Sequence, residues 1–317
     1  MSKIETVAIT DEQKWLETRL KDVTSTEASA LYELNPYQTV FELFHAKKNQ
    51  EVIRIEENER MSWGKRLEQS IAEGAAESMG WDVEPLNVYM RNPETRMGSS
   101  FDYQINNHDD GPGILEVKNV DGIVYKSKWI DDGAGNIEAK EHIELQVQHQ
   151  MEVADINWCA IVALVGGNTQ KIVYRKRDRD IGADLKKRVA EFWHSIAADR
   201  APSANYEQDA EFIIKSLRAT ATPGLIAEAD TELNELIQSY AFVQQEASDL
   251  AKMKDAYKAQ ILERVGEASK ILSSVGSISC GVTAPSAGTL ITPDMVGTTI
   301  GGRRGFRNFR LTKKKGN

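Results

Sequence analysis

The sequence predicts an α/β (α+β) protein in which helices flank a mixed β-sheet, followed by a long C-terminal helical extension. Between residues 15 and 198, segments of helical and strand periodicity follow one another in the order helix, strand hairpin, helix, two strands, helix. This order is typical of a mixed sheet covered by helices. Between residues 228 and 272, apolar residues recur at alternating spacings of three and four, which predicts one long helix. We therefore expect three parts, at 1–202, 203–276 and 277–317.

The composition is that of an ordinary globular protein, because 41% of the 317 residues are hydrophobic and 27% are charged. No run of about 18 apolar residues occurs, which argues against a membrane-spanning helix. The first residues lack the apolar core of a signal peptide, so we expect a cytoplasmic protein. Cys159 and Cys280 are the only cysteines. Two cysteines exclude a disulfide framework and a four-cysteine metal or iron–sulfur site within one chain.

The net charge of -9 argues against a uniformly basic nucleic-acid surface, but basic residues gather in the last stretch, GGRRGFRNFRLTKKKGN. In this stretch arginines alternate with two phenylalanines, a pattern that suits a nucleic-acid backbone with stacked bases. A solubilising tail explains the same composition equally well. The arginines concerned are Arg303, Arg304, Arg307 and Arg310.

Two short helices are predicted near the N-terminus, at 27–34 and 39–47. Thr24 or Thr26 is the expected N-cap of the first. Arg19 and these threonines then lie near a helix N-terminus, where backbone amides, hydroxyls and a guanidinium would favour a phosphate. The alternative is a capping threonine beside a surface arginine.

Residues 62–81 predict an amphipathic helix, because apolar residues recur there at a spacing of four. Glu68 lies one residue from the apolar stripe of this helix. Its side chain is therefore expected either in solvent or in a site beside the sheet. The run VEPLNVYMRN, at 83–92, predicts the strand that enters the next hairpin.

The stretch 98–118 predicts a hairpin, because its middle, INNHDDGPG, is rich in turn-forming residues. The turn would place Asp102 beside Glu116. In a strand, residues two apart face the same side, so Glu116 and Lys118 point together while Val117 points into the core. Two carboxylates and an ammonium are therefore expected at one place.

This set of side chains suits a hard metal ion. Carboxylates at close range repel each other, and a cation between them relieves the repulsion. Oxygen ligands without Cys or His suit Mg²⁺ or Mn²⁺. A neighbouring lysine can orient water and stabilise charge on a phosphate. The same three residues in a solvated hairpin would form only a cross-strand salt bridge, since Glu-x-Lys is frequent by chance.

Beyond Lys118 a loop or lid is predicted, followed by a helix at 141–155, strands near 158–167 and 170–177, and a helix at 181–198. Glutamines form a stripe on the first of these helices. His142 and His149 lie nearby, and two histidines at this spacing can bind metal, but no third ligand accompanies them at a zinc-like spacing.

In this order the motifs resemble the lambda exonuclease and YqaJ-type viral recombinase family of the PD-(D/E)xK nucleases, over about residues 15–202. The matching pieces are W-x3-R, T-x-T-E-A-x-A, NPY, GKRLE, GILEVK, QVQHQM, ALVGGN and EFW. The resemblance implies a restriction-endonuclease-like fold. Two departures occur. Phe101 stands where the family has a proline before the aspartate, and the residues after Lys118 do not continue with the family's Cys-Pro.

The resemblance also implies a metal site, a catalytic pair and a pocket for a terminal phosphate. The implied metal ligands are Asp102, Glu116, Glu68 and the carbonyl of Val117. Lys118 and Gln146 are expected to act with them in catalysis. The phosphate pocket falls on Arg19, Thr26 and Ser100. Because helix phase is uncertain by about a residue, Gln148 and Gln150 are alternatives to Gln146.

By this resemblance, the protein is expected to be a Mg²⁺-dependent exonuclease, with Mn²⁺ as a substitute. It would degrade linear double-stranded DNA from 5′ ends and leave 3′ single strands for phage-type recombination in a bacterial host. A single-strand annealing protein and a ring-shaped homo-oligomer are the implied partners. Two alternatives remain: a restriction-type endonuclease of the same fold, and an inactive DNA-binding or assembly protein. A helicase-associated iron–sulfur nuclease is disfavoured by the cysteine count.

Overall fold

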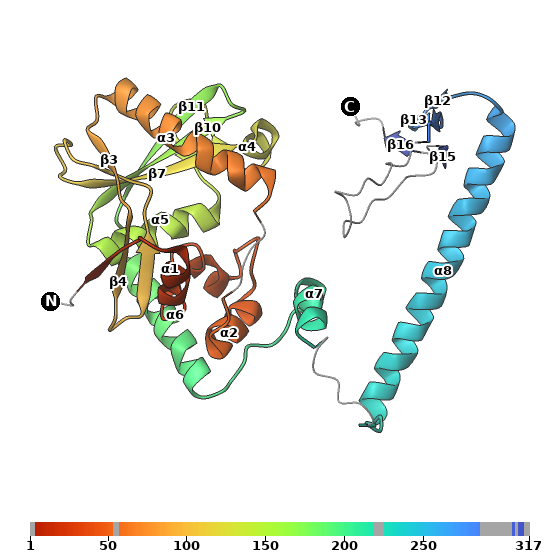
Figure 1. Cartoon of the computed structure of the whole chain (residues 1–317), viewed down its shortest axis with the longest axis horizontal. Helices are drawn as coiled ribbons and strands as arrows, with labels where there is room; N and C mark the ends of the chain where they lie inside the picture. The colour runs from red at the N-terminus through yellow and green to blue at the C-terminus, as the bar shows by residue number, and fades with distance from the viewer. Residues whose placement is uncertain (1–3, 53–56, 218–224, 286–305, 308–309, 314–317) are drawn as a thin grey trace, which may run out of the picture. The chain divides into compact units, whose positions relative to one another are not determined.

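The structure is a computed structural model (Figure 1) that describes residues 4–52, 57–217, 225–285, 306–307 and 310–313. The chain divides into two compact units, residues 1–221 and 222–317. Within the described ranges, no helix has both the length and the apolar character needed to cross a bilayer.

The central sheet of the first unit has five strands in the order β11-β10-β7-β6-β3. Strand β7 lies in the middle, parallel to β10 and antiparallel to β6. A parallel neighbour needs a crossover connection, and helix α5 (Glu141–Ala154) lies in it. This arrangement confirms the predicted mixed sheet. The strands are β3 (Val83–Pro85), β6 (Tyr103–Ile105), β7 (Gly113–Val120), β10 (Trp158–Val165) and β11 (Thr169–Lys176).

A second sheet has the order β1-β4-β5-β2. Its strands are β1 (Glu5–Ala8), β2 (Val23–Thr24), β4 (Val88–Asn92) and β5 (Met97–Ser100). The single strand predicted at 83–92 is therefore divided between two sheets, as β3 and β4. The division falls at Leu86, whose backbone N–H donates to the carbonyl of Asp102 at 3.0 Å.

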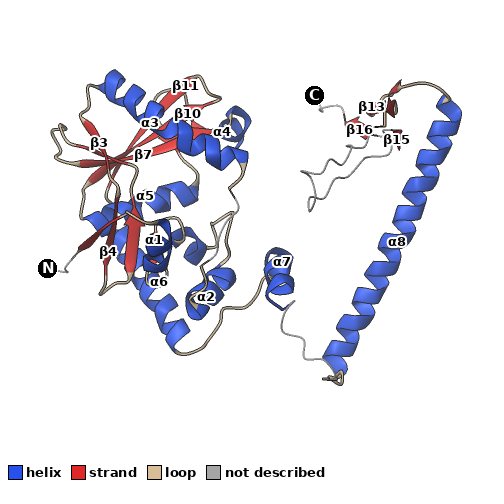
Figure 2. Cartoon of the chain, in the orientation of Figure 1, coloured by secondary structure: helices blue, strands red, loops and turns tan. Residues whose placement is uncertain are grey.

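Helices cover both faces of the central sheet (Figure 2). Helix α3 (Glu59–Met79) packs on the face that contains Val117, in a buried apolar cluster. Helix α5 packs on the other face, toward which Glu116 and Lys118 point. The strand alternation expected for these three residues is thus present, and it places the two charged side chains beneath α5.

The other elements of the first unit differ from the expectation in two places. The helix predicted at 27–34 is a short 3-10 helix, η1 (Ala28–Tyr32), which ends at Glu33 with a left-handed φ of 58°. The loop predicted after Lys118 contains α4 (Gly122–Lys128) and a small hairpin. The remaining elements are α1 (Glu12–Arg19), α2 (Val40–Asn49), β8 (Ile130–Asp131), β9 (Ile137–Glu138), α6 (Arg179–Ala197) and α7 (Tyr206–Leu217).

The second unit contains the long helix α8 (Thr231–Val265), which confirms the predicted helical extension. Asp230 caps it by accepting a hydrogen bond from the backbone N–H of Leu233 at 2.8 Å. Short strands follow in two small sheets: β12 (Lys270–Leu272), β13 (Gly276–Ser279), β14 (Val282–Thr283), β15 (Phe306–Arg307) and β16 (Arg310–Lys313). The stretch GVTAPSAGTLITP, at 281–293, is readable from its sequence as a short hairpin, and it lies mostly outside the described residues.

Candidate active site

Asp102 lies at the bend between β5 and β6, where the chain passes from one sheet to the other. Its Oδ2 accepts a hydrogen bond from the backbone N–H of Val117 at 2.8 Å. The backbone pairing of β6 with β7 ends at Tyr103 and Leu115. Beyond this pair, the Asp102 side chain supplies the next hydrogen-bond acceptor for β7. The N–H and C=O of a strand residue face the same edge. The carbonyl of Val117 therefore faces the Asp102 side as well.

Glu116 is the most buried charged group of the site, with 2% of its surface exposed. Its Oε1 accepts hydrogen bonds from the Lys118 ammonium and from Nε2 of Gln146, the latter at 2.6 Å. Its Oε2 accepts from Nε2 of Gln150 at 2.7 Å. The Lys118 Nζ also donates to Oε1 of Gln146 at 3.3 Å. Two glutamines, one helical turn apart on α5, thus hold the carboxylate and the lysine together.

The sequence did not decide which of Gln146, Gln148 and Gln150 reaches the site, and the side-chain contacts do. Gln146 and Gln150 both contact Glu116. Gln148 points elsewhere: its Nε2 donates to the carbonyl of Lys176 at 3.0 Å, and its Oε1 accepts from the N–H of Asp178 at 2.9 Å. Gln148 therefore ties α5 to the start of α6.

Burial and neighbouring charge set the protonation of the site. Burial raises the pKa of Asp102 well above its usual range, and the Glu116 carboxylate raises it further. Glu68, half-buried on α3, has a raised pKa for the same two reasons, in the same order. Burial alone would lower the pKa of Lys118, but the Glu116 and Asp102 carboxylates outweigh it and raise this pKa. Lys118 is therefore an ammonium ion at neutral pH.

The donor set fits a divalent cation in its chemistry. Asp102 and Glu68 carry raised pKa values because of burial and nearby negative charge, which a cation would offset. All the available donors are hard oxygens, the ligands that Mg²⁺ prefers. Across the described ranges, no three His, Cys, Asp or Glu side chains lie close enough to form a ready cluster. The carboxylate oxygens of Glu116 are instead engaged by an ammonium and two amides.

Two of the residues expected in the phosphate pocket lie together. Arg19, the last residue of α1, donates from Nη2 to the hydroxyls of Thr24 and Thr26, each at 3.4 Å. The guanidinium also lies over the ring of Trp15, with 4.6 Å from Cζ to the ring centre. The predicted N-cap is wrong: Glu27, rather than Thr24 or Thr26, is the N-cap residue of the short η1, and its side chain makes no capping hydrogen bond.

Ser100 joins this group through Trp15, whose Nε1 donates to the Ser100 hydroxyl at 2.9 Å. The carbonyl of Ser100 accepts from Nε2 of Gln150 at 3.3 Å. Because Gln150 also binds Glu116, an unbroken set of contacts runs from Arg19 to the buried carboxylate. The three predicted phosphate-pocket residues thus lie on one side of the acidic site.

A pocket of about 260 Å³ is lined by residues of both groups. Thr26 of the first group lines it, and so do Lys118 and Gln146 of the acidic site, whereas Arg19, Ser100, Asp102 and Glu116 are not among its lining residues. Arg60 and Lys140 also contribute to its lining, so the walls are rich in positive charge. An anionic chain entering this pocket would meet both the hydroxyl group of Thr26 and the lysine.

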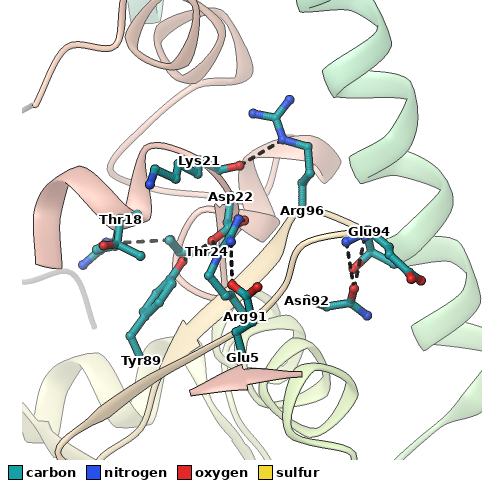
Figure 3. Close-up of polar contacts among 12 residues, drawn as sticks. Glu5, Thr18, Lys21, Asp22, Thr24, Tyr89, Arg91, Asn92, Glu94 and Arg96 are labelled. Atoms are coloured by element: carbon teal, nitrogen blue, oxygen red, sulfur yellow. Dashed lines mark hydrogen bonds and ion pairs between the residues drawn. The ribbon is translucent and has the colours of Figure 1, made fainter. Parts of the chain in front are cut away.

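The turn between α1 and β2 is anchored by a buried aspartate (Figure 3). Asp22, with 0% of its surface exposed, accepts two hydrogen bonds from the Arg91 guanidinium on β4, both at 2.8 Å. The hydroxyl of Tyr89 donates to the same carboxylate at 3.2 Å. Such a two-point guanidinium–carboxylate pair fixes geometry more strongly than a single contact. It holds the turn that separates Arg19 from Thr24.

Among the residues that the structure describes, neither His142 nor His149 belongs to a group of three His, Cys, Asp or Glu side chains that could hold a metal ion. Burial lowers the pKa of His149 to about 4. The pKa of His142, which lines the pocket, is lowered to about 4 by burial and then by Lys140 and Lys118. Both rings are neutral at physiological pH.

The predicted DNA-binding arginines of the tail are only partly placed. Arg303 and Arg304 lie outside the described residues. Arg307 and Arg310 are described by their backbone alone, in β15 and β16.

Trp15 is a contributor that sequence reasoning did not single out, and Gln150 was named only as an alternative to Gln146. The spacing W-x3-R carried the signal for Trp15, because residues four apart on a helix lie on one face. Gln150 lies four residues after Gln146 and was expected on the same face, but helix phase alone did not show that both would reach Glu116.

Comparisons with known proteins find similar sequences and structures. Residues 14–157 match the family model of the YqaJ-like viral recombinase domain. The uncharacterized protein YqaJ of Bacillus subtilis (strain 168) is 25% identical over 264 residues, which cover 80% of this chain and 78% of that protein. Among solved structures, an alkaline exonuclease (LHK-Exo) from Laribacter hongkongensis covers 66% of this chain and 100% of its own, at 17% identity and a TM-score of 0.46. LHK-Exo in complex with dAMP matches with the same coverage and TM-score at 18% identity.

Proposed function

We propose that this chain is a metal-dependent DNA exonuclease, because residues 14–157 match the family model of the YqaJ-like viral recombinase domain, in agreement with the sequence resemblance. It degrades linear double-stranded DNA from 5′ ends, leaves 3′ single strands and serves phage-type recombination in the cytoplasm of a bacterial host. The observation that carries the proposal is the meeting of Asp102, Glu116 and Lys118 on β7 and its neighbouring bend, beside a basic pocket.

The residues divide the chemistry between them. Asp102, Glu116, Glu68 and the Val117 carbonyl would hold Mg²⁺, or Mn²⁺ in its place, which polarises the phosphate and lowers the pKa of bound water. Lys118 is held as an ammonium ion by the carboxylates. It orients the attacking water and offsets negative charge on the phosphate in the transition state. Gln146 fixes the Lys118 side chain through its Oε1.

The 5′ end is selected by Arg19, Thr26 and Ser100. A guanidinium and hydroxyl groups are suited to a terminal phosphate, because charge-assisted hydrogen bonds to phosphate oxygens are strong. The pocket that Thr26 and Lys118 both line supports this assignment, since an anionic chain bound in it would meet both residues.

Digestion of end-labelled linear duplex DNA with Mg²⁺ tests the proposal. Wild type should release nucleotides, and Lys118→Ala should not. Release of no nucleotide from any end by the wild type would refute the exonuclease assignment. Circular duplex cut as fast as linear duplex would favour the restriction-type endonuclease. DNA binding that survives chelation and Asp102→Ala, without hydrolysis under any metal, would favour the inactive assembly protein.

The pocket is tested by the chemistry of the 5′ end. Arg19→Ala should slow the digestion of 5′-phosphorylated duplex more than that of 5′-hydroxyl duplex, because only the former loses a charged partner. Equal slowing of both would remove Arg19 from the pocket. Digestion products also report polarity, since 5′ attack leaves 3′ single strands.

Two further parts of the proposal concern assembly and the tail. We propose a ring-shaped homo-oligomer and a single-strand annealing protein as partner, which would explain processive digestion and the use of its product. The tail arginines Arg303, Arg304, Arg307 and Arg310 would contact DNA. Deletion of residues 303–315 should reduce the log–log salt slope of duplex binding by about 0.9 for each phosphate that the tail neutralises. An unchanged slope would favour a solubilising tail.

A further inference from the structure

A lysine is buried behind the proposed phosphate pocket. Lys47, in the last turn of α2, has only 2% of its side chain exposed. A lysine is almost never fully buried unless it is paired. We therefore expect its ammonium to have partners inside the protein.

The Lys47 ammonium joins two separate segments that together carry the pocket. Its Nζ forms an ion pair with Oε2 of Glu27 at 2.8 Å. The same Nζ donates to the backbone carbonyl of Arg19 at 2.9 Å. That carbonyl belongs to the last turn of α1, where carbonyls lack partners within the helix. One buried charge therefore links the end of α1 to the segment that follows β2.

Glu27 extends this link to the threonines. Its Oε2 also accepts a hydrogen bond from the backbone N–H of Thr24 at 2.9 Å. The backbone N–H of Glu27 in turn donates to the carbonyl of Thr24 at 3.0 Å. Two hydrogen bonds between Thr24 and Glu27 therefore fix the turn that contains Thr24 and Thr26. The Arg19 guanidinium faces this turn, and its position depends on the Arg19 backbone, which Lys47 contacts.

Burial and the ion pair act in opposite directions on the pKa of each partner. Burial lowers the pKa of Lys47, and the Glu27 carboxylate opposes this shift. Burial acts to raise the pKa of Glu27, but the Lys47 ammonium and then the Arg19 guanidinium outweigh it and lower this pKa. Glu27 thus stands between two cations. One is buried and structural, and the other faces the proposed phosphate position.

We propose that Lys47 is a positioning residue for the recognition of the 5′ phosphate. Through its ion pair with Glu27, it sets the spacing between the Arg19 guanidinium and the two threonine hydroxyls. This inference rests on the proposed function of the same pocket. Lys47 does not touch the DNA, and it acts only through the backbone of Arg19 and through Glu27.

The test uses the full chain with both charges removed together. Lys47→Met alone leaves Glu27 buried without its partner, and breaking one half of a buried pair is strongly destabilising. The double variant Lys47→Met/Glu27→Gln leaves no such charge, and the glutamine amide can still accept from Thr24. Circular dichroism and thermal unfolding establish that the variant is folded. Lys47→Arg, which keeps the charge, is the rescue variant.

The measured quantity is the ratio of initial digestion rates on 5′-phosphorylated and 5′-hydroxyl linear duplexes of the same sequence. For the double variant, the ratio should fall about tenfold toward one, which is the size of one hydrogen bond to a charged group. The rate on the 5′-hydroxyl duplex should stay close to that of the wild type. Lys47→Arg should recover a substantial part of the ratio.

Arg177→Met is the matched control, because Arg177 forms an ion pair with Glu152 at 2.8 Å in which both side chains are 5% exposed. This pair lies between α5 and the start of α6, away from the threonine turn. Its removal should lower stability and leave the ratio unchanged. A double variant that keeps the wild-type ratio, or a wild type with no preference for phosphate, would overturn the inference.

Binding measurements separate this inference from the proposed function. Fluorescence anisotropy with Ca²⁺ and labelled duplexes gives the ratio of dissociation constants for phosphorylated and hydroxyl ends. If the wild type hydrolyses nothing but prefers the phosphorylated end, and the double variant loses that preference, the nuclease assignment fails and the positioning role stands. If the preference persists in the double variant, the positioning role fails, whatever the activity.

Discussion

Replacement of Asp102 by asparagine should stabilise the metal-free protein while it abolishes activity. Burial and Glu116 raise the pKa of Asp102 above the value that the residue has in the unfolded chain. Between these two pKa values the native state binds a proton that the unfolded state has released. The free energy of unfolding therefore falls as the pH rises through this window, and the decrease is complete above the folded pKa. Asparagine is neutral throughout and can still accept from Val117.

The magnitude follows from the single proton involved. Over the window that begins near pH 4, the wild-type free energy of unfolding should fall by up to about 1.4 kcal/mol per pH unit relative to Asp102→Asn. Urea unfolding in the presence of a chelator at a series of pH values measures this difference. Added Mg²⁺ should reverse the order, since a ligand at 100 times its dissociation constant stabilises the native state by about 2.7 kcal/mol. The asparagine variant should gain much less.

Asp110→Asn is the matched control, because Asp110 lies in the turn between β6 and β7 and 59% of its side chain is exposed. It should leave both the pH dependence and the Mg²⁺ effect as in the wild type. The reasoning fails if Asp102→Asn has the same pH dependence as the wild type in chelator. The metal assignment fails if Mg²⁺ stabilises both proteins equally.

Five further substitutions test other contacts. Gln146→Ala should slow hydrolysis at least tenfold in a single-turnover assay. Gln148→Ala should leave the rate unchanged and lower the free energy of unfolding by about 1 to 3 kcal/mol, because it removes the two hydrogen bonds of the amide to the backbone of Lys176 and Asp178. Arg91→Met leaves the buried Asp22 of Figure 3 without its charged partner. It should lower the free energy of unfolding, measured with urea, by about 3 to 5 kcal/mol. Gly113→Ala places a methyl group 2.3 Å from the Trp158 indole and should lower the free energy of unfolding by about 1 to 3 kcal/mol. Gly64→Ala adds a methyl group with nothing within 4 Å, in a helix, and should raise the free energy of unfolding by up to about 1 kcal/mol. Thermal unfolding measures both changes.

The central fold was predictable from the sequence because its signals are local. The alternation around Val117 shows which side chains face the core, and the four-residue spacing on α3 and α5 shows which helices are amphipathic. The division of 83–92 between two sheets was not predictable in this way. It depends on the hydrogen bond from Leu86 to Asp102, a residue 16 positions away, and periodicity carries no information on such contacts.

The candidate site was predicted as a set of residues, but not as a geometry. The hairpin pattern brought Asp102 and Glu116 together, yet it assigned Asp102 to a paired strand. In the structure the residue lies at a bend, and its side chain does the pairing. Nor could the sequence choose among the glutamines, because a one-residue error in helix phase changes which of them faces β7. Lys47 gave no signal at all, since a lysine in the last turn of a helix usually faces solvent.

The contacts of Trp15 give the proposed pocket a spectroscopic reporter. Trp15 is one of six tryptophans in the chain. Its indole donates to the Ser100 hydroxyl and lies beneath the Arg19 guanidinium. An anion that draws the guanidinium toward itself changes the electric field across the ring, and with it the emission of this tryptophan. The difference in fluorescence between the wild type and Trp15→Phe therefore follows the occupation of the pocket directly, before any bond is broken and without a label on the DNA.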